Sequence, residues 1–312
     1  AQSIGPDELK SIRESFVKDG ATIAAQNAIQ HTKNLNALCR NVAAEKLDDN
    51  FRYKVKALPT APDQGESGRC WLFTGLNVLR AAAIDKYDLG EFQFSQNYVS
   101  FYDLLEKSNL MLQAMIDTRD LPIDDRKVDW LLEHPIGDGG QFTGVSNLIT
   151  KYGVVPKEVM PETYQSNNTS LMRTILSMKL RQYALELRGL KPAKAAERKV
   201  EMLTEIYRIL AECLGVPPTE FEWARYDAKG NFVSRGIYTP KSFYNEFVGE
   251  DLEHNYVMVM NDPTREYNKV YEIEYDRHLY DGDNWLYVNL PVDRIKEMAA
   301  ASIKGGDAMY FS

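Results

Sequence analysis

Residues 64–80 read QGESGRCWLFTGLNVLR and join a glycine-rich loop to an apolar helix. After the loop, apolar residues recur at the spacing of a helix that packs against a core: Leu72, Phe73, Leu76, Leu79, Ala83 and Ile84. This spacing predicts a largely buried helix whose first turn carries Cys70. Free backbone N–H groups and the helix dipole stabilise a thiolate at such a position, so Cys70 is the candidate nucleophile.

Gln64 lies six residues before Cys70, across the loop from it. From there its side-chain amide is able to donate a hydrogen bond next to the sulfur. An acyl-transfer reaction needs such a donor, because negative charge develops on the substrate carbonyl oxygen. Taken alone, a cysteine in an apolar helix is more often a small buried residue of the core. The complete sequence of residues 64–71 favours the interpretation of Cys70 as a nucleophile over that of a core residue.

The frame Ser67-Gly68-Arg69-Cys70-Trp71 resembles the Cys-Gly-Ser/Ala-Cys-Trp/Tyr signature of papain-type cysteine peptidases. It is more similar still to the bleomycin hydrolase/aminopeptidase C branch, whose members carry Ser-Gly-Arg-Cys-Trp. The resemblance implies a thiol aminopeptidase that hydrolyses peptides, with Cys70 as the nucleophile and Gln64 as the oxyanion donor. It also implies assembly as a homohexamer.

A second glycine-rich segment, Gly137-Asp138-Gly139-Gly140-Gln141, precedes a predicted helix that ends at Gly153. By itself this segment is a helix N-terminus with a weak turn signal. The functional interpretation is that glycines let an extended peptide approach the backbone. Papain-like enzymes carry an Asn/Asp-Gly-Gly segment at this point. The resemblance therefore implies a group of substrate-binding residues: Asp138, Gly139, Gly140, Gly68 and Trp71.

The first part of the chain is predicted to form helices and a strand that precede the Gln64 loop. Residues 5–50 are predicted to be helical, with Pro6 in a first turn and a second helix over Ala21–Leu38. Cys39, at the end of that helix, is predicted to pack. Residues 51–58 alternate between apolar and polar and predict a strand.

Further along, the pattern changes from helical to β-rich. Ser95 is the expected N-cap of a helix to about Ile116, and long helices are predicted over 168–188 and 192–215. The apolar stripe of the last helix is predicted at Ala196, Val200, Leu203, Tyr207, Leu210 and Leu214, with Cys213 buried beside it. A hairpin is predicted around 227–231, followed by a helix from Pro240 to Phe247 and strands at 256–260, 270–275, 285–290 and, beginning, 308–311.

These elements predict an α+β fold with three parts. Residues 1–63 form an N-terminal lead-in, residues 64–215 a helical left domain with the catalytic helix and a helical insertion, and residues 216–312 a β-rich right domain. The resemblance implies that this is the papain-like fold and that its antiparallel right domain is incomplete in this chain.

Composition narrows the class of protein. A net charge of −8 and a pI near 5.2 do not indicate a nucleic-acid-binding face. No run of about 18 apolar residues predicts a membrane span, and nothing indicates a cofactor or a metal site. The three cysteines, Cys39, Cys70 and Cys213, are too few for a disulfide framework. The resemblance implies a cytoplasmic protein, whereas a periplasmic or secreted one is expected if Ala1 is an N-terminus left by signal removal.

The sequence departs from the family in its histidines. A cysteine peptidase needs an imidazole to ionise the thiol and protonate the leaving amine, and usually an asparagine that orients it. None of the four histidines lies at the papain spacing of about 130–150 residues after Cys70. His31 is expected on a polar helix edge, His134 precedes a proline, and His254 and His278 are expected among charges at strand edges, so none is predicted to be catalytic.

In the bleomycin hydrolase branch the histidine and asparagine follow a strand that residues 308–312 resemble, so we expect both beyond Ser312. Two functions of different classes stay open. The first is a thiol aminopeptidase acting through Cys70, of which residues 1–312 alone are not expected to hydrolyse peptides. The second is a non-catalytic papain-like fragment or scaffold. The two differ in whether an imidazole reaches the thiol.

Overall fold

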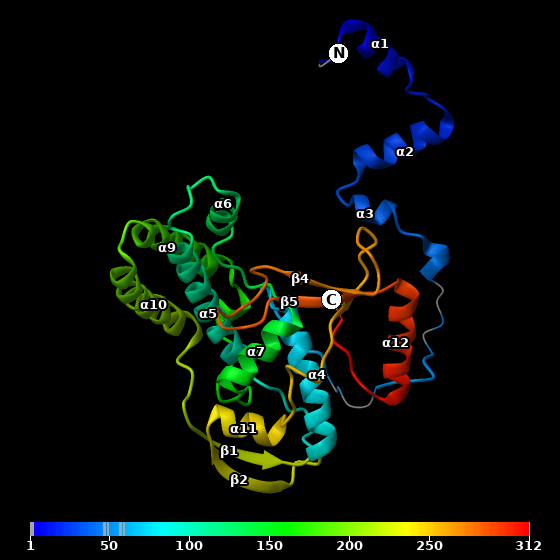
Figure 1. The fold of residues 1–312 in the computed structure, drawn as a ribbon. Coiled ribbons are helices and arrows are strands. Elements are labelled where there is room, and N and C mark those ends of the chain that lie inside the picture. The colour runs from blue at the N-terminus through cyan, green and yellow to red at the C-terminus, as the bar shows by residue number, and fades with distance from the viewer. Residues whose placement is uncertain (1–2, 46–47, 49, 56–57, 59, 312) are drawn as a thin grey trace. The chain divides into compact units, whose positions relative to one another are not determined.

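A computed structural model describes residues 3–45, 48, 50–55, 58 and 60–311. Figure 1 shows the fold. The chain divides into two compact units, Ala1–Arg52 and Tyr53–Ser312. The finer division predicted at residues 63 and 215 stays a prediction.

The first unit contains helices α1 (Pro6–Glu14), α2 (Gly20–His31) and α3 (Leu35–Leu38), followed by the 3₁₀-helix η1 (Val42–Glu45). None of the described residues in these helices is buried. The single helix predicted over 21–38 is wrong, because Thr32 is extended and Asn34 caps a new helix. Cys39 is exposed and does not pack as predicted.

The strand predicted at 51–58 is not present in the described residues of that segment, which are 51–55 and 58. Residues 56–57 lie outside the described part of the chain. Among the described residues no strand pairs with this segment, and a strand needs a partner to satisfy its backbone.

The second unit is built around α5 (Gln96–Asp117), which contacts α4 (Cys70–Tyr87), α7 (Phe142–Tyr152), α9 (Ser170–Arg188) and α10 (Pro192–Leu214). Ser95 caps α5 as predicted, its side chain accepting from the N–H of Tyr98. Leu72, Phe101, Leu104, Leu148 and Leu180 are among the fully buried residues between these helices. Two short helices, α6 (Arg126–Glu133) and α8 (Tyr164–Asn167), were not predicted.

The buried face of α10 differs from the predicted stripe. Val200 is 61% exposed, and the buried residues of α10 are Ala195, Met202, Ile206, Leu210 and Leu214, of which Leu210 and Leu214 were predicted. The two stripes lie one position apart over the first part of the helix and share Leu210 and Leu214, so helical spacing alone does not decide between them. Cys213 is partly buried rather than fully buried.

The last part of the chain contains two small sheets. Strands β1 (Phe221–Tyr226) and β2 (Phe232–Tyr238) form the predicted antiparallel hairpin, and α11 (Pro240–Phe247) contacts β2 (Figure 1). The second sheet has the order β3-β5-β4, from Val259–Met260, Trp285–Asn289 and Lys269–Ile273. β4 pairs antiparallel with β5, whereas β3 pairs parallel with it.

Helix α12 (Val292–Gly305) follows, and the described residues 308–311 are not in a strand, contrary to prediction. The α+β class is confirmed by this mixture of helices and small sheets. Among the described residues, no helix is long and apolar enough to cross a membrane.

Candidate active site

Cys70 is the first residue of α4, and its side chain is exposed. The residues on either side are buried: Arg69 is 1% exposed and Trp71 is 2% exposed. The backbone N–H groups of Leu72 and Phe73 donate to the carbonyl of Arg69, which starts the helix. The thiol is therefore presented to solvent from a first turn whose neighbouring side chains are fixed.

Gln64 is half-buried in the loop before Cys70. Its Nε2 donates to the carbonyl of Ser67 over 2.6 Å, and the Ser67 hydroxyl donates to the carbonyl of Gln64 over 2.7 Å. A side-chain amide nitrogen carries two N–H donors. One of them closes the loop, and the other is the predicted donor to an oxyanion.

Arg69 fastens the loop from the buried side. Its Nη2 lies 2.9 Å from Oε2 of Glu162, and its Nε donates to the Ser67 hydroxyl over 2.9 Å. The guanidinium also lies 5.0 Å from the ring centre of Phe73. A buried ion pair of this kind fixes the position of the chain, because separating its charges in a dry environment is costly.

Asp138 fastens the loop from the opposite side. Its carboxylate accepts from the N–H of Gly68 (2.6 Å), the hydroxyl of Thr169 (2.6 Å) and Nη1 of Arg173 (2.8 Å). Its backbone carbonyl accepts from the indole of Trp71 over 2.7 Å. Burial by itself raises the pKa of Asp138, but the hydrogen bonds and the Arg173 charge outweigh it and hold the pKa below its usual value. The group is a carboxylate near neutral pH.

These contacts occupy the side chains of Asp138 and Trp71, for which substrate binding was predicted. Gly139 is exposed, and Gly68 and Gly140 are half-buried. Apart from the predicted approach of a substrate, packing also requires glycine at position 68, because a Cβ there would overlap the Asp138 carboxylate. The direct substrate-binding role stays a prediction for all five residues.

The loop also pairs with the chain before α9. The N–H of Glu66 donates to the carbonyl of Asn167 over 2.7 Å, and the N–H of Thr169 donates to the carbonyl of Glu66 over 3.3 Å. Gly65 has a φ of +63°, and its Cα lies against the Asn167 backbone, where a side chain would not fit. The nucleophile loop, residues 64–69, is thus held on three sides.

His278 is where the sequence interpretation was wrong. It lies in the loop between β4 and β5, is 4% exposed rather than at a strand edge, and its Nδ1 contacts Oδ1 of Asp103 at 2.5 Å. Its ring centre is 4.6 Å from that of Trp71. Burial and the charge of Lys107 lower the pKa of His278. His278 and Leu279 are both buried, although the residues beside them in the sequence are charged and suggested an exposed segment.

The other three histidines are exposed. Within the described residues, the Nδ1 atoms of His31, His134, His254 and His278 contact Asn27, Trp130, Asp251 and Asp103 respectively, and none has Cys70 as its partner. Sequence analysis also missed Asp103 and Lys107. Their signal is a pair of opposite charges four residues apart on a helix that is otherwise largely apolar there.

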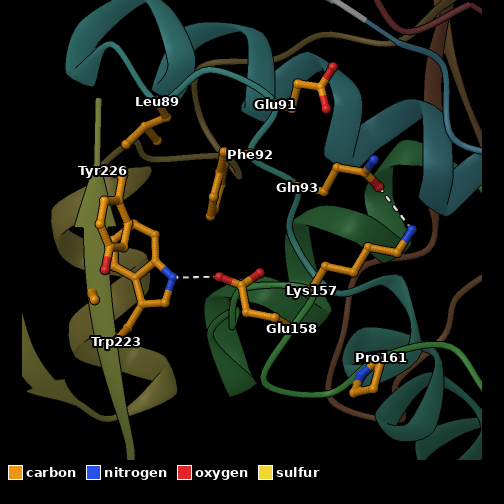
Figure 2. A pocket seen from close by; sticks show the side chains of 10 residues that line it. Leu89, Glu91, Phe92, Gln93, Lys157, Glu158, Pro161, Trp223 and Tyr226 are labelled. Carbon is orange, nitrogen blue, oxygen red and sulfur yellow. Dashed lines mark hydrogen bonds between the residues drawn. The ribbon is translucent and has the colours of Figure 1, made fainter. Parts of the chain in front are cut away.

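A cavity of about 470 Å³ lies apart from the nucleophile loop (Figure 2). Figure 2 shows aromatic side chains on one side, including Phe92 and Trp223, and charged ones on the other. Two of the charged groups already bond to neighbours: the Trp223 indole donates to Glu158 over 2.7 Å, and Lys157 donates to Gln93 over 2.9 Å. None of its lining residues belongs to the loop of Cys70.

Comparison with known proteins shows a consistent likeness. The model of the Peptidase C1-like family matches residues 3–312. Human bleomycin hydrolase is 35% identical over 325 residues, covering 100% of this chain and 71% of that protein. Aminopeptidase C of Lactobacillus delbrueckii subsp. lactis is 36% identical over 318 residues, covering 100% and 70%. The crystal structure of PepW from Lactobacillus rhamnosis HN001 superposes with a TM-score of 0.90 at 34% identity, covering 98% and 70%.

Proposed function

This chain belongs to the Peptidase C1-like family, in the branch of the bleomycin hydrolases and aminopeptidases C, and is a cysteine-type aminopeptidase; we propose that it removes N-terminal residues of peptides through an acyl-enzyme on Cys70. The observation that supports this role is the placement of Cys70. Its thiol is exposed at the first turn of α4, while Arg69 and Trp71 beside it are buried and hydrogen-bonded. Preorganisation of this kind holds a nucleophile in one attack geometry.

In the proposed reaction the Cys70 sulfur attacks the carbonyl carbon of the first peptide bond. The carbonyl oxygen takes the negative charge and receives a hydrogen bond from the second N–H of Gln64. Collapse of this intermediate releases the shortened peptide as an amine and leaves an aminoacyl thioester on Cys70. Water then hydrolyses the thioester.

The proton transfers need an imidazole, which takes the thiol proton and gives one to the departing amine. Each of the four histidines has its Nδ1 on another group, and among the described residues His278, whose ring packs against Trp71, has no hydrogen bond to the Cys70 thiol. We therefore propose that the histidine and its asparagine come from a part of the protein beyond residue 312. The same observation favours the second candidate, a non-catalytic papain-like fragment or scaffold.

Selective alkylation tests the nucleophile. Iodoacetamide at about pH 6, followed by peptide mapping, is expected to label Cys70 before Cys39 and Cys213. The two other thiols are internal controls, because Cys39 is exposed without a helix N-terminus, and burial raises the pKa of Cys213. Faster labelling of either control would contradict the role of Cys70.

Turnover tests the function. Release of coumarin from an aminoacyl-coumarin is expected from the protein extended past Ser312 and lost in its Cys70→Ser variant. Residues 1–312 alone are expected to be inactive, because general acid–base catalysis contributes about 10²–10⁴ in rate. Cys70-dependent turnover by residues 1–312 would show that one of the four histidines is the base. No turnover by the extended protein would favour the scaffold.

Three further features of the proposal rest on family resemblance. They are assembly as a homohexamer, restriction to free N-termini and a cytoplasmic location.

A further inference from the structure

His278 joins the loop between β4 and β5 to three helices. Its Nδ1 contacts Asp103 of α5, and its ring packs against Trp71 of α4. On the remaining side lie Gly140 and Gly144, at the start of α7, where a Cβ would overlap the imidazole ring. The ring therefore fills a space that glycines leave open.

The contacts of His278 continue to the second glycine-rich segment. Asp103 also pairs with Lys107 at 2.7 Å, and the same ammonium donates to the carbonyls of Gly137 (3.0 Å) and Gly139 (2.7 Å). The Lys107 ammonium lies 5.4 Å from the ring centre of Trp71. His278, Asp103 and Lys107, which we call the His278 cluster, thus connect the β4–β5 loop to the backbone on which substrate binding was predicted.

The charges of the cluster favour a neutral imidazole. Asp103 and Lys107 balance each other, so protonation of His278 would add a positive charge to a site that is closed to solvent. Asp276 of the same loop, which accepts from Gln141 over 3.0 Å, is the other acidic group that faces the ring. Burial and Lys107 lower the pKa of His278, against the opposing effect of Asp103 and Asp276. The neutral ring donates its Nδ1–H to Asp103.

We propose that His278 is a positioning residue, whose neutral imidazole holds Asp103 and, through Lys107, fixes the backbone of Gly137–Gly140 for substrate binding. The proposal rests on the proposed function, since a peptide must use this segment. His278 acts through other groups, because it contacts Trp71 and Asp103 and is closed to solvent. Its effect is therefore expected on KM more than on kcat.

Two variants of His278 separate this role from simple space filling. In His278→Asn the side-chain nitrogen is able to replace Nδ1 as the donor to Asp103, whereas His278→Ala leaves Asp103 without it. In the protein extended past Ser312, we expect His278→Ala to raise KM for an aminoacyl-coumarin by about tenfold, with kcat within about threefold of wild type. His278→Asn is expected to restore KM to within about threefold. His254→Ala, at an exposed histidine, is the matched control and is expected to change neither constant.

The pH dependence is a second kinetic readout. Because burial and Lys107 lower the pKa of His278, KM of the wild type is expected to stay constant through the ordinary histidine range of about 6.5 and to rise only at lower pH, where a second positive charge beside Lys107 destabilises the cluster. His278→Asn has no such proton to gain and is expected to lose this rise. An unchanged pH dependence of KM in His278→Asn would overturn the proposal.

Amide hydrogen exchange tests the positioning without relying on activity. In His278→Ala, peptides that cover 137–144 are expected to exchange at least about tenfold faster, while peptides from α9 stay unchanged. If His278→Ala does not fold, Lys107→Met removes the bonds to Gly137 and Gly139 and is expected to have the same effect. Unchanged exchange in the folded variants would overturn the proposal.

These experiments separate the positioning role of His278 from the proposed aminopeptidase activity on which it rests. Failure of the wild-type protein extended past Ser312 to hydrolyse any peptide would contradict the proposed function, and exchange at 137–144 would still decide the positioning. Loss of kcat together with loss of Cys70 alkylation in His278→Asn would show that His278 is the base of the thiol, which overturns the positioning role.

Discussion

Two buried carboxylates, Asp138 and Asp103, hold the two sides of the candidate site in different ways. Asp138 is 5% exposed and binds donors that keep their protons at ordinary pH: an amide, a hydroxyl and the guanidinium of Arg173. Asp103 is 2% exposed and binds an ammonium and an imidazole. Asp138 binds the loop before Cys70 directly, whereas Asp103 is connected to the glycine-rich segment through Lys107. The geometry of the thiol is therefore expected to depend little on pH, and that of the binding segment more.

The largest effect is expected where the nucleophile loop carries its own buried charge. Arg69→Met leaves Glu162 without the cation that balances it, and we expect the free energy of unfolding to fall by about 3–5 kcal/mol. The double variant Arg69→Met, Glu162→Leu is expected to recover most of that loss, because it removes both charges. Chemical denaturation measures both. A double variant as unstable as the single one would show that Arg69 acts through packing instead.

Gln64→Ala separates the chemistry of the loop from its shape. We expect kcat to fall by about 10²–10³ with KM nearly unchanged, because an oxyanion donor acts on the intermediate. This is the opposite of the pattern expected for the His278 cluster. The rate of Cys70 alkylation is the control and is expected to stay within about twofold of wild type. Parallel losses of alkylation and kcat would mean that Gln64 mainly closes the loop through Ser67.

A smaller effect is expected from Asp138→Asn, which keeps the shape of the side chain but removes its charge. The amide is able to accept from Gly68 or from Arg173 with one oxygen only, so the loop loses part of its support. We expect kcat to fall about tenfold, equivalent to about 1.4 kcal/mol, with KM nearly unchanged. Steady-state kinetics would contradict the comparison if KM rose instead, because Asp138 would then act on substrate binding directly.

The smallest effect is the pH dependence of stability. Since the pKa of His278 is lowered in the folded protein, the unfolded chain binds the proton first, and stability is lost as pH falls from about 6.5 toward the folded pKa. The pKa of Asp138 is lowered too, so its contribution is complete above about 3.9 and is lost only as pH falls below that value. Between pH 7 and 5, thermal unfolding of His278→Asn is therefore expected to depend less on pH than that of wild type.

The sequence predicted the elements that depend on local signals. Cys70 at the start of a buried helix, the Ser95 cap and the turn at 227–231 follow from capping, periodicity and turn residues, which act within a few positions. The same signals did not decide which stripe of α10 is buried. That choice depends on the shapes of α5 and α9, which no pattern within α10 contains.

For the candidate site, the sequence predicted the placement of Cys70 at the first turn of a helix but not the contacts that hold its loop. Cys70 and Gln64 lie in one short motif, so their proximity is local. Asp138, by contrast, was predicted to bind substrate, and only the folded chain shows that it accepts from Gly68 and Thr169. His278 was misplaced for a similar reason, because the charges beside it in sequence hide its contact with Asp103 in another element.

The hydrogen bond between Gly68 and Asp138 also bears on the order in which the protein acquires its reactivity. The two residues are separated by 70 positions, so the loop is fastened only after the helices between them have come together. Closing so long a segment costs chain entropy, and such contacts form late in folding. In a newly synthesised chain the Cys70 thiol is therefore present before the hydrogen bond between Gly68 and Asp138, which orients its loop, has formed. In refolding, helical circular dichroism is expected to recover first and selective alkylation of Cys70 afterwards. The Cys70 thiol is then expected to become selectively reactive only once the polypeptide is folded.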